Sequence, residues 1–140
     1  MEKSNIIIVD DEKNILSSLR RDLIDESYNV FFAGSGEDAL NMLSEKPFKV
    51  ILSDVNMPGM DGFELLEIVK ERYPDIISVI FSGLSDVQLI LSIVNARQIE
   101  RYLTKPWSIS DVKLTLTQCI ELFDLRKKVI ELQQQLKERS

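Results

Sequence analysis

Two residue types that often build reactive sites are scarce in this chain, which has no histidine and a single cysteine, Cys119. Without histidine, the chain has no imidazole for acid–base catalysis, for metal binding or for carrying a phosphoryl group. One cysteine cannot form a disulfide within the chain, which fits a reducing compartment. Any metal site is therefore expected to use oxygen ligands, which favours a hard cation.

Long hydrophobic runs are also missing from the sequence. The apolar residues 6–9 are followed at once by Asp10 and Asp11, so this run is too short for the core of a signal peptide. No apolar run approaches the roughly 18 residues that a membrane-spanning helix needs. The formal net charge of -6 argues against nucleic acid or an anionic membrane as the main partner, because both attract basic surfaces. We expect a cytoplasmic protein without direct nucleic-acid or membrane binding.

The composition and the apolar pattern suit one globular domain, with 140 residues of which 44% are hydrophobic and 29% charged. Short runs rich in β-branched residues alternate with longer amphipathic segments. The short runs predict strands at residues 6–9, 28–32, 49–53, 76–81 and 99–103. Helical spacing of apolar residues predicts helices at 13–26, 35–44, 62–72, 85–95 and from about 108 onward. In the first helix, Leu19, Leu23 and Ile24 are expected on the buried face.

This alternation is typical of an α/β fold in which a five-stranded, doubly wound parallel sheet is covered by helices on both faces. In such a sheet, the loops at the carboxyl ends of the strands form the binding crevice. Polar residues that follow the predicted strands should therefore meet at one edge of the sheet. They are Asp10, Asp11, Asp54, Asn56, Ser82, Thr104 and Lys105.

The chemistry of this set indicates phosphoryl transfer. Three carboxylates brought together repel one another unless a cation lies among them, and oxygen ligands favour Mg²⁺ or Mn²⁺. A nearby lysine and a small hydroxyl would bind further oxygens of a phosphoryl group. Because no Ser–His or Cys–His pair exists, an aspartate is itself the candidate nucleophile.

The residues that carry this chemistry resemble the receiver domain of bacterial two-component response regulators, over about residues 4–123. The similarity lies in Asp10-Asp11, in Asp54 within SDVNMPGMDG, in Ser82-Gly83 and in the segment YLTKPW at 102–107. The resemblance implies a flavodoxin-like sheet with the strand order 2-1-3-4-5. It identifies Asp54 as the phosphoacceptor and Asp11 as a direct Mg²⁺ ligand, with Asp10 acting on the metal through water.

The resemblance implies roles for further residues of the set. The backbone carbonyl of Asn56 is expected to bind the metal, together with Asp11 and Asp54. Ser82 and Lys105 are expected to bind the phosphoryl group, and Tyr102 matches the aromatic residue whose ring moves inward as Ser82 moves. Loop geometry is assigned to Pro58, Gly59 and Pro106, and the bond before Pro106 is expected to be cis.

As a receiver, the chain would be a signalling switch and not a metabolic enzyme. A sensor histidine kinase or a phosphotransfer protein would donate the phosphoryl group to Asp54. A surface formed by about residues 85–123 would report the change, and slow self-hydrolysis of the aspartyl phosphate would reset the switch.

Two alternatives stay open. A phosphatase of the haloacid-dehalogenase type also uses an aspartate and Mg²⁺, but it needs a second aspartate where this chain has Asn56. A pseudo-receiver adaptor would dimerise without being phosphorylated.

The last predicted helix carries two apolar stripes. Val112, Leu116, Cys119, Ile120 and Phe123 form one stripe, which is expected to pack on the sheet. The other stripe has the 3-4-3-4 spacing of a coiled-coil seam and consists of Leu122, Leu125, Val129, Leu132 and Leu136. Because this second stripe lies on another side of the helix, it is expected to form a parallel homodimer, in which Glu121 would attract Arg126 of the other copy. The sequence thus predicts a receiver domain at 4–123 and a coiled-coil extension at 124–140.

Overall fold

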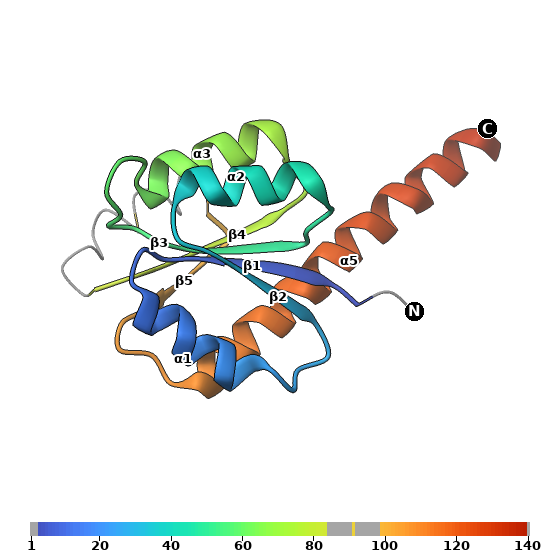
Figure 1. The fold of residues 1–140 in the computed structure, drawn as a ribbon. Helices are drawn as coiled ribbons and strands as arrows, with labels where there is room; N and C mark the ends of the chain where they lie inside the picture. Colours follow the sequence, from blue (N-terminus) through green and yellow to red (C-terminus); the bar gives the residue numbers. More distant parts are fainter. Residues whose placement is uncertain (1–2, 84–90, 92–98, 140) are drawn as a thin grey trace.

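The strands in the described part of the chain form one five-stranded sheet. The computed structural model describes residues 3–83, 91 and 99–139. The strands are β1 (Asn5–Val9), β2 (Asn29–Ala33), β3 (Val50–Asp54), β4 (Ile77–Ser82) and β5 (Arg101–Thr104). They pair in the order β2-β1-β3-β4-β5, and every pair is parallel. The predicted fold class and strand order are therefore confirmed (Figure 1).

Helices cover both faces of this sheet (Figure 1). The described helices are α1 (Lys13–Leu23), α2 (Gly36–Glu45), α3 (Gly62–Arg72) and α5 (Ile109–Arg139). Helices α1 and α5 pack on one face, and α2 and α3 pack on the other. The helix predicted at residues 85–95 lies almost wholly outside the described residues, as does that part of the surface predicted to report phosphorylation. Within the described part of the chain, no helix is long and apolar enough to cross a membrane.

The central strand β1 shows why the two faces are both apolar. Successive side chains of a strand point to opposite faces of the sheet. Ile6 and Ile8 belong to the core cluster under α1 and α5, whereas Ile7 and Val9 belong to the cluster under α2 and α3. All four are fully buried. A strand that is covered on both faces therefore needs an apolar residue at every position. Polar residues can follow only at its ends.

Helix α1 is shorter than the sequence predicts. It ends at Leu23, and the amide of Glu26 donates to the Leu23 carbonyl in a turn that replaces the last predicted helical residues. Leu19 and Leu23 are buried as expected, but Ile24 is 75% exposed. The prediction for Ile24 was wrong because one residue beyond Leu23 the side chain points about 100° away from the buried stripe.

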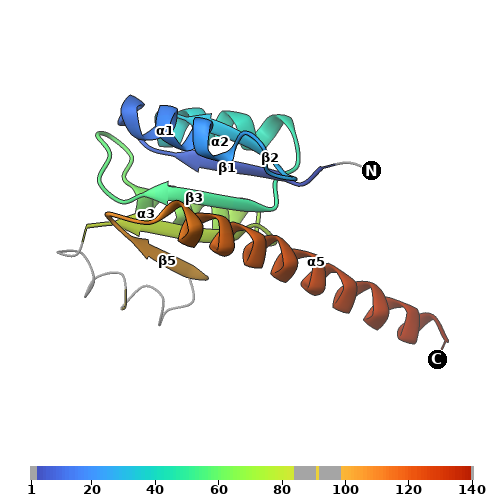
Figure 2. The same ribbon diagram turned by 90° about the horizontal axis from the view of Figure 1, so that it is seen from below.

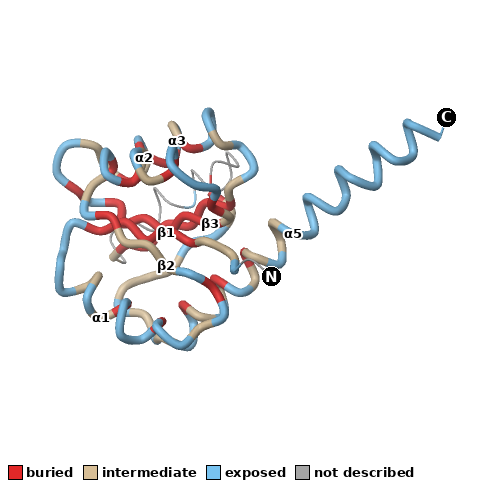
Figure 3. Tube along the Cα trace, turned by 45° about the vertical axis from the view of Figure 1, so that its right-hand side comes forward, coloured by how far each residue is buried: buried red, intermediate tan, exposed pale blue. Residues whose placement is uncertain are grey.

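Helix α5 is one continuous helix of 31 residues that runs along the sheet and continues past its edge (Figures 1 and 2). The residues of the first stripe pack against the core, with Val112, Leu116 and Cys119 fully buried. Beyond the sheet, the helix is exposed on all sides (Figure 3). Its covered and uncovered parts are therefore set by where the sheet ends.

The second stripe of α5 divides at this edge. Leu122 is partly buried against the core cluster, which corrects the expectation that the whole stripe points away from the domain. The rest of the stripe is exposed, and it consists of Leu125 (63%), Val129 (52%), Leu132 (46%) and Leu136 (67%). Ile130, which lies outside the predicted seam, is also 48% exposed.

Candidate functional site

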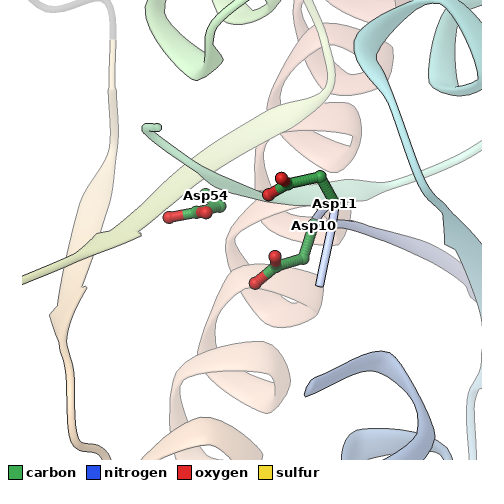
Figure 4. A group of neighbouring side chains, drawn as sticks. All are labelled: Asp10, Asp11 and Asp54. Atoms are coloured by element: carbon green, nitrogen blue, oxygen red, sulfur yellow. The ribbon is translucent and has the colours of Figure 1, made fainter. Parts of the chain in front are cut away.

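Three carboxylates gather at the carboxyl edge of the sheet, as the sequence predicts (Figure 4). Asp10 and Asp11 follow β1, and Asp54 is the last residue of β3. The two strands are neighbours with Val9 opposite Ser53, so residues 10 and 54 leave the sheet side by side. One carboxylate oxygen from each of the three residues lies within 4.8 Å of the others. Asp10 and Asp54 are buried, whereas Asp11 is exposed.

The Asp54 carboxylate is held in a fixed position. Its Oδ1 accepts hydrogen bonds from the backbone amide of Val55, at 2.9 Å, and from Nζ of Lys105, at 3.3 Å. Burial raises the pKa of Asp54 above its ordinary value, although the charge and the hydrogen bond of Lys105 act in the opposite direction. The residue is only 4% exposed, so the protein covers most of its surface.

Asp10 is fully buried and only half satisfied. Its Oδ1 accepts a hydrogen bond from the backbone amide of Glu12 at 2.9 Å. Its Oδ2 has no hydrogen-bond partner and lies 3.6 Å from Nζ of Lys105. Burial, with a smaller contribution from the nearby charge of Asp54, raises the pKa of Asp10 to about 6. A buried carboxylate oxygen of this kind needs a cation or a proton.

Lys105 connects the ends of three strands. It follows β5 directly, and its Nζ lies near both Asp54 and Asp10. The same Nζ lies 4.9 Å from the centre of the Phe81 ring, and Phe81 packs edge-to-face against Trp107 at 5.0 Å. Phe81 was not predicted from the sequence as a site residue, although its position one residue before Ser82 on a predicted strand, beside the strand of Asp54, could have identified it.

Ser82 and Tyr102 lie on the two strands beyond Asp54. Ser82 ends β4 and is 1% exposed, and its Oγ donates to the Gly83 carbonyl at 3.3 Å. Tyr102 lies in the middle of the edge strand β5, with its side chain at the surface and 39% exposed. The structure thus places Ser82 at the carboxyl edge next to Thr104, whereas Tyr102 lies two residues earlier on β5 with an exposed side chain.

The loop from β3 to α3 is fixed by two glycines. Gly59 has a φ of +75°, a left-handed conformation that a residue with a side chain rarely adopts. Gly62 begins α3, and its amide donates to the Val55 carbonyl at 2.9 Å. A Cβ at Gly62 would overlap the carbonyl oxygen of Asp54 and lie 2.9 Å from its carbonyl carbon. From the sequence, Gly62 was expected only as the start of a helix, and this close approach was missed.

The other predicted loop residues are where the sequence places them. Asn56 lies in the loop two residues after Asp54, at the exposed surface, and Pro58 lies between it and Gly59. The peptide bond between Lys105 and Pro106 is cis, as expected. Asp61 caps α3, because its Oδ1 accepts from the amide of Glu64 at 2.9 Å.

The acidic cluster fits Mg²⁺. All three donors are carboxylate oxygens, which a hard divalent cation prefers, and their spacing lets one ion contact them. The unpartnered Oδ2 of Asp10 is a buried oxygen that such an ion, or a water bound to it, would satisfy. Lys105 supplies one positive charge for three negative ones, so the described side chains alone leave the pocket negative.

Comparison with known proteins relates the chain to signalling proteins. Residues 6–117 match the family model of the response regulator receiver domain. The hydrogenase transcriptional regulatory protein HoxA of Cupriavidus necator is 37% identical over 120 residues, which cover 86% of this chain and 25% of that protein. A putative NtrX-like response regulator of Rickettsia conorii is 31% identical over 94% of this chain and 28% of that protein. The chain thus spans about a quarter of the length of these relatives.

Solved structures show the same architecture over almost the whole chain. A crystal structure described as adenylate cyclase from Rhodopirellula baltica superposes with a TM-score of 0.90 at 31% identity and covers 95% of this chain and 98% of that chain. The signal receiver domain of an HD domain-containing protein from Pseudomonas fluorescens superposes with a TM-score of 0.84 at 30% identity, over 91% of this chain and 94% of that chain.

Proposed function

The chain belongs to the response regulator receiver domain family, and on this basis we propose that it is a phospho-accepting switch of a two-component system. Asp54 takes the phosphoryl group, and a histidine kinase or phosphotransfer protein in the cytoplasm donates it. The observation that carries the proposal is the contact of Lys105 with a buried aspartate inside a cluster of three carboxylates. This arrangement has a nucleophile, a cation site and a fixed positive charge within one crevice.

The residues divide the chemistry among them. The Val55 amide and Lys105 bind Oδ1 of Asp54, so we assign the attack on phosphorus to Oδ2. The bond from phosphorus to the donor nitrogen breaks as the aspartyl phosphate forms. The electron pair of that bond stays on the nitrogen, and the donor imidazole, already protonated on its other ring nitrogen, leaves as a neutral ring. Asp11, Asp54 and the carbonyl of Asn56 would hold Mg²⁺ directly and Asp10 through water. A bound Mg²⁺ would offset the negative charge of the pocket and of the transferred group.

The covalent charge then changes which contacts are favourable. Lys105 follows the phosphoryl oxygens, and the hydroxyl of Ser82 turns from the Gly83 carbonyl to donate to them. Tyr102 moves inward from its exposed position as Ser82 moves. Such a change can shift a two-state equilibrium only by the difference in contact energy between the two states. Residues 85–123 are the proposed reporting surface.

Incubation with a small acyl phosphate and Mg²⁺ tests the proposal directly. We expect the intact mass to rise by one phosphoryl group and the modified peptide to map to Asp54. Chelation of the metal by EDTA is expected to prevent the modification, because the carboxylate cluster then repels the anionic donor. A pseudo-receiver adaptor would give no mass change and would not bind the phosphoryl analogue beryllofluoride. Turnover of phosphate esters would instead favour a phosphatase.

We also propose that the exposed end of α5 forms a parallel homodimer. Leu125, Val129, Leu132 and Leu136 keep the heptad spacing and are exposed in the single chain, which supports pairing with a second copy. The expected attraction between Glu121 and Arg126 of the other copy competes with a bond inside the chain, because Arg126 already binds Glu100. The proposed boundary between the receiver and the extension stays at residues 123 and 124.

Sedimentation of the intact chain is expected to show a dimer, and the double variant Val129→Asp, Leu132→Asp is expected to be monomeric. The two new carboxylates would have to be buried at the seam, which costs more than the seam provides. Gln134→Asp is the matched control, since it adds a carboxylate on the opposite side of the same helix and should leave the dimer intact. A monomeric parent chain would contradict the proposal.

A further inference from the structure

Two ion pairs tie α5 to the edge of the sheet at which the strands begin. Lys49, directly before β3, lies 2.7 Å from Asp124, measured from Nζ to Oδ1. Glu100, directly before β5, accepts two hydrogen bonds from the guanidinium of Arg126, at 2.9 and 3.1 Å. The Arg126 hydrogen bonds lower the pKa of Glu100. Because the guanidinium of Arg126 binds both carboxylate oxygens of Glu100 at once, the pair fixes the orientation of the two side chains as well as joining opposite charges.

The same two strands carry the proposed phosphorylation chemistry at their other ends. Strand β3 ends with Asp54, and Lys105 directly follows β5. Nζ of Lys105 lies 3.3 Å from Oδ1 of Asp54. Each of these strands therefore has a site residue at one end and an ion pair to α5 at the other.

The two strands that connect these ends are short. Strand β3 has five residues and β5 has four. Strand β5 lies at the edge of the sheet and pairs only with β4, and the amides at its two ends donate to β4. Glu100 donates to the Ser78 carbonyl at 2.9 Å, and Lys105 donates to the Ser82 carbonyl at 2.8 Å. Glu100 and Lys105 therefore flank the same four-residue strand, one at each end.

The two ion pairs hold α5 from opposite sides. Asp124 and Arg126 are two residues apart, which places them about 200° apart around a helix. Phe123, which packs against the core cluster, faces the domain between them. A rotation of α5 about its axis therefore lengthens at least one of the two pairs. Together they fix the rotation of the helix where it leaves the domain.

We propose that the pairs Lys49–Asp124 and Glu100–Arg126 form a clamp through which the phosphorylation state of Asp54 sets the rotation of the α5 extension. The inference rests on the proposed function. When Lys105 follows a phosphoryl group, β5 shifts relative to β3, and the clamp takes a second arrangement. The exposed seam from Leu125 to Leu136 turns with the helix, so the clamp determines which side of the extension is presented to a second copy of the chain.

Hydrogen–deuterium exchange of the full chain, with and without beryllofluoride and Mg²⁺, tests the clamp. In the parent protein we expect the analogue to protect the loop at residues 55–61 and to change exchange of the α5 amides at 121–130. In the double variant Asp124→Asn, Arg126→Gln, the α5 amides should exchange about two- to fivefold faster than in the parent, which is the effect of losing partly exposed ion pairs. Their response to beryllofluoride should disappear, while the loop remains protected.

The control breaks a different ion pair on the same helix. Lys113 lies 3.7 Å from Glu26, which follows α1 and belongs to neither strand of the clamp, so Lys113→Gln should keep the beryllofluoride response of residues 121–130. Coupling between two sites is reciprocal. If beryllofluoride changes the equilibrium of the clamp, loss of the clamp should change the affinity for beryllofluoride by the same factor. Fluorescence of Trp107, which packs on the Phe81 ring beside Lys105, reports that affinity.

The outcomes separate the clamp from the switch. Protection of the loop without any change at residues 121–130 of the parent protein would overturn the clamp and leave the switch standing. An unchanged response of these residues in the clamp variant would overturn it as well. Absence of loop protection in the parent protein would overturn both proposals, because no ligand would then bind at Asp54.

Discussion

The substitution Asp54→Asn is expected to abolish phosphoryl uptake from an acyl phosphate, while leaving the fold intact. The amide oxygen of asparagine is too weak a nucleophile to replace the carboxylate. The variant should unfold at no lower temperature than the parent, since the charge of Asp54 raises the pKa of the neighbouring buried Asp10 and its removal relieves that repulsion. Intact mass over time and thermal unfolding measure the two effects on the same sample.

Asp61→Asn is the control for this substitution. It makes the same chemical change in the same loop, but Asp61 caps α3 and is not part of the carboxylate cluster. Asparagine is also a good helix cap, so phosphoryl uptake and stability should both stay near those of the parent. Continued formation of an acyl phosphate in Asp54→Asn, for example on Asp11, would remove Asp54 from the role of acceptor.

The substitution Gly62→Ala should lower the free energy of unfolding by about 3 kcal/mol, although alanine is the better helix former by about 1 kcal/mol. Steric overlap decides the sign, because the new Cβ would meet the Asp54 carbonyl and lie 3.0 Å from Cα of Val55. These are backbone atoms of the strand end and cannot turn aside as a side chain would. Denaturation by urea measures the loss, and phosphoryl uptake should slow because the displaced backbone carries Asp54.

Gly34→Ala is the matched control for the stability effect. A Cβ at Gly34 would meet nothing within 4 Å, so the same substitution there should change the free energy of unfolding by no more than about 1 kcal/mol. Equal losses in the two variants would mean that glycine is needed for chain flexibility in general and not for the approach to Asp54. A stable Gly62→Ala variant would show that the loop can move away from the strand.

Much of the fold and of the candidate site follows from local patterns. The run at residues 6–9 has no polar position, which is what a strand covered on both faces requires, and both faces of β1 are buried. Helix α3 spans Gly62–Arg72 in the structure, as predicted, with the Tyr73-Pro74 pair at its end; the Asp61 cap at its start appears only in the structure. Because parallel strands end at the same edge of a sheet, the order of strands and polar residues along the chain was enough to predict that residues 10, 11, 54 and 105 lie together.

The pairing of side chains across the fold was decided only by the tertiary structure. Lys49 and Asp124 are 75 residues apart in the sequence, and Glu100 and Arg126 are 26 apart, so no periodicity connects them. Leu122 and Leu125 share one heptad pattern, yet the domain covers the first and leaves the second exposed. Hydrophobic spacing reports only the direction in which a side chain leaves its own helix or strand. What lies in that direction depends on where distant segments end, and therefore on the packed chain as a whole.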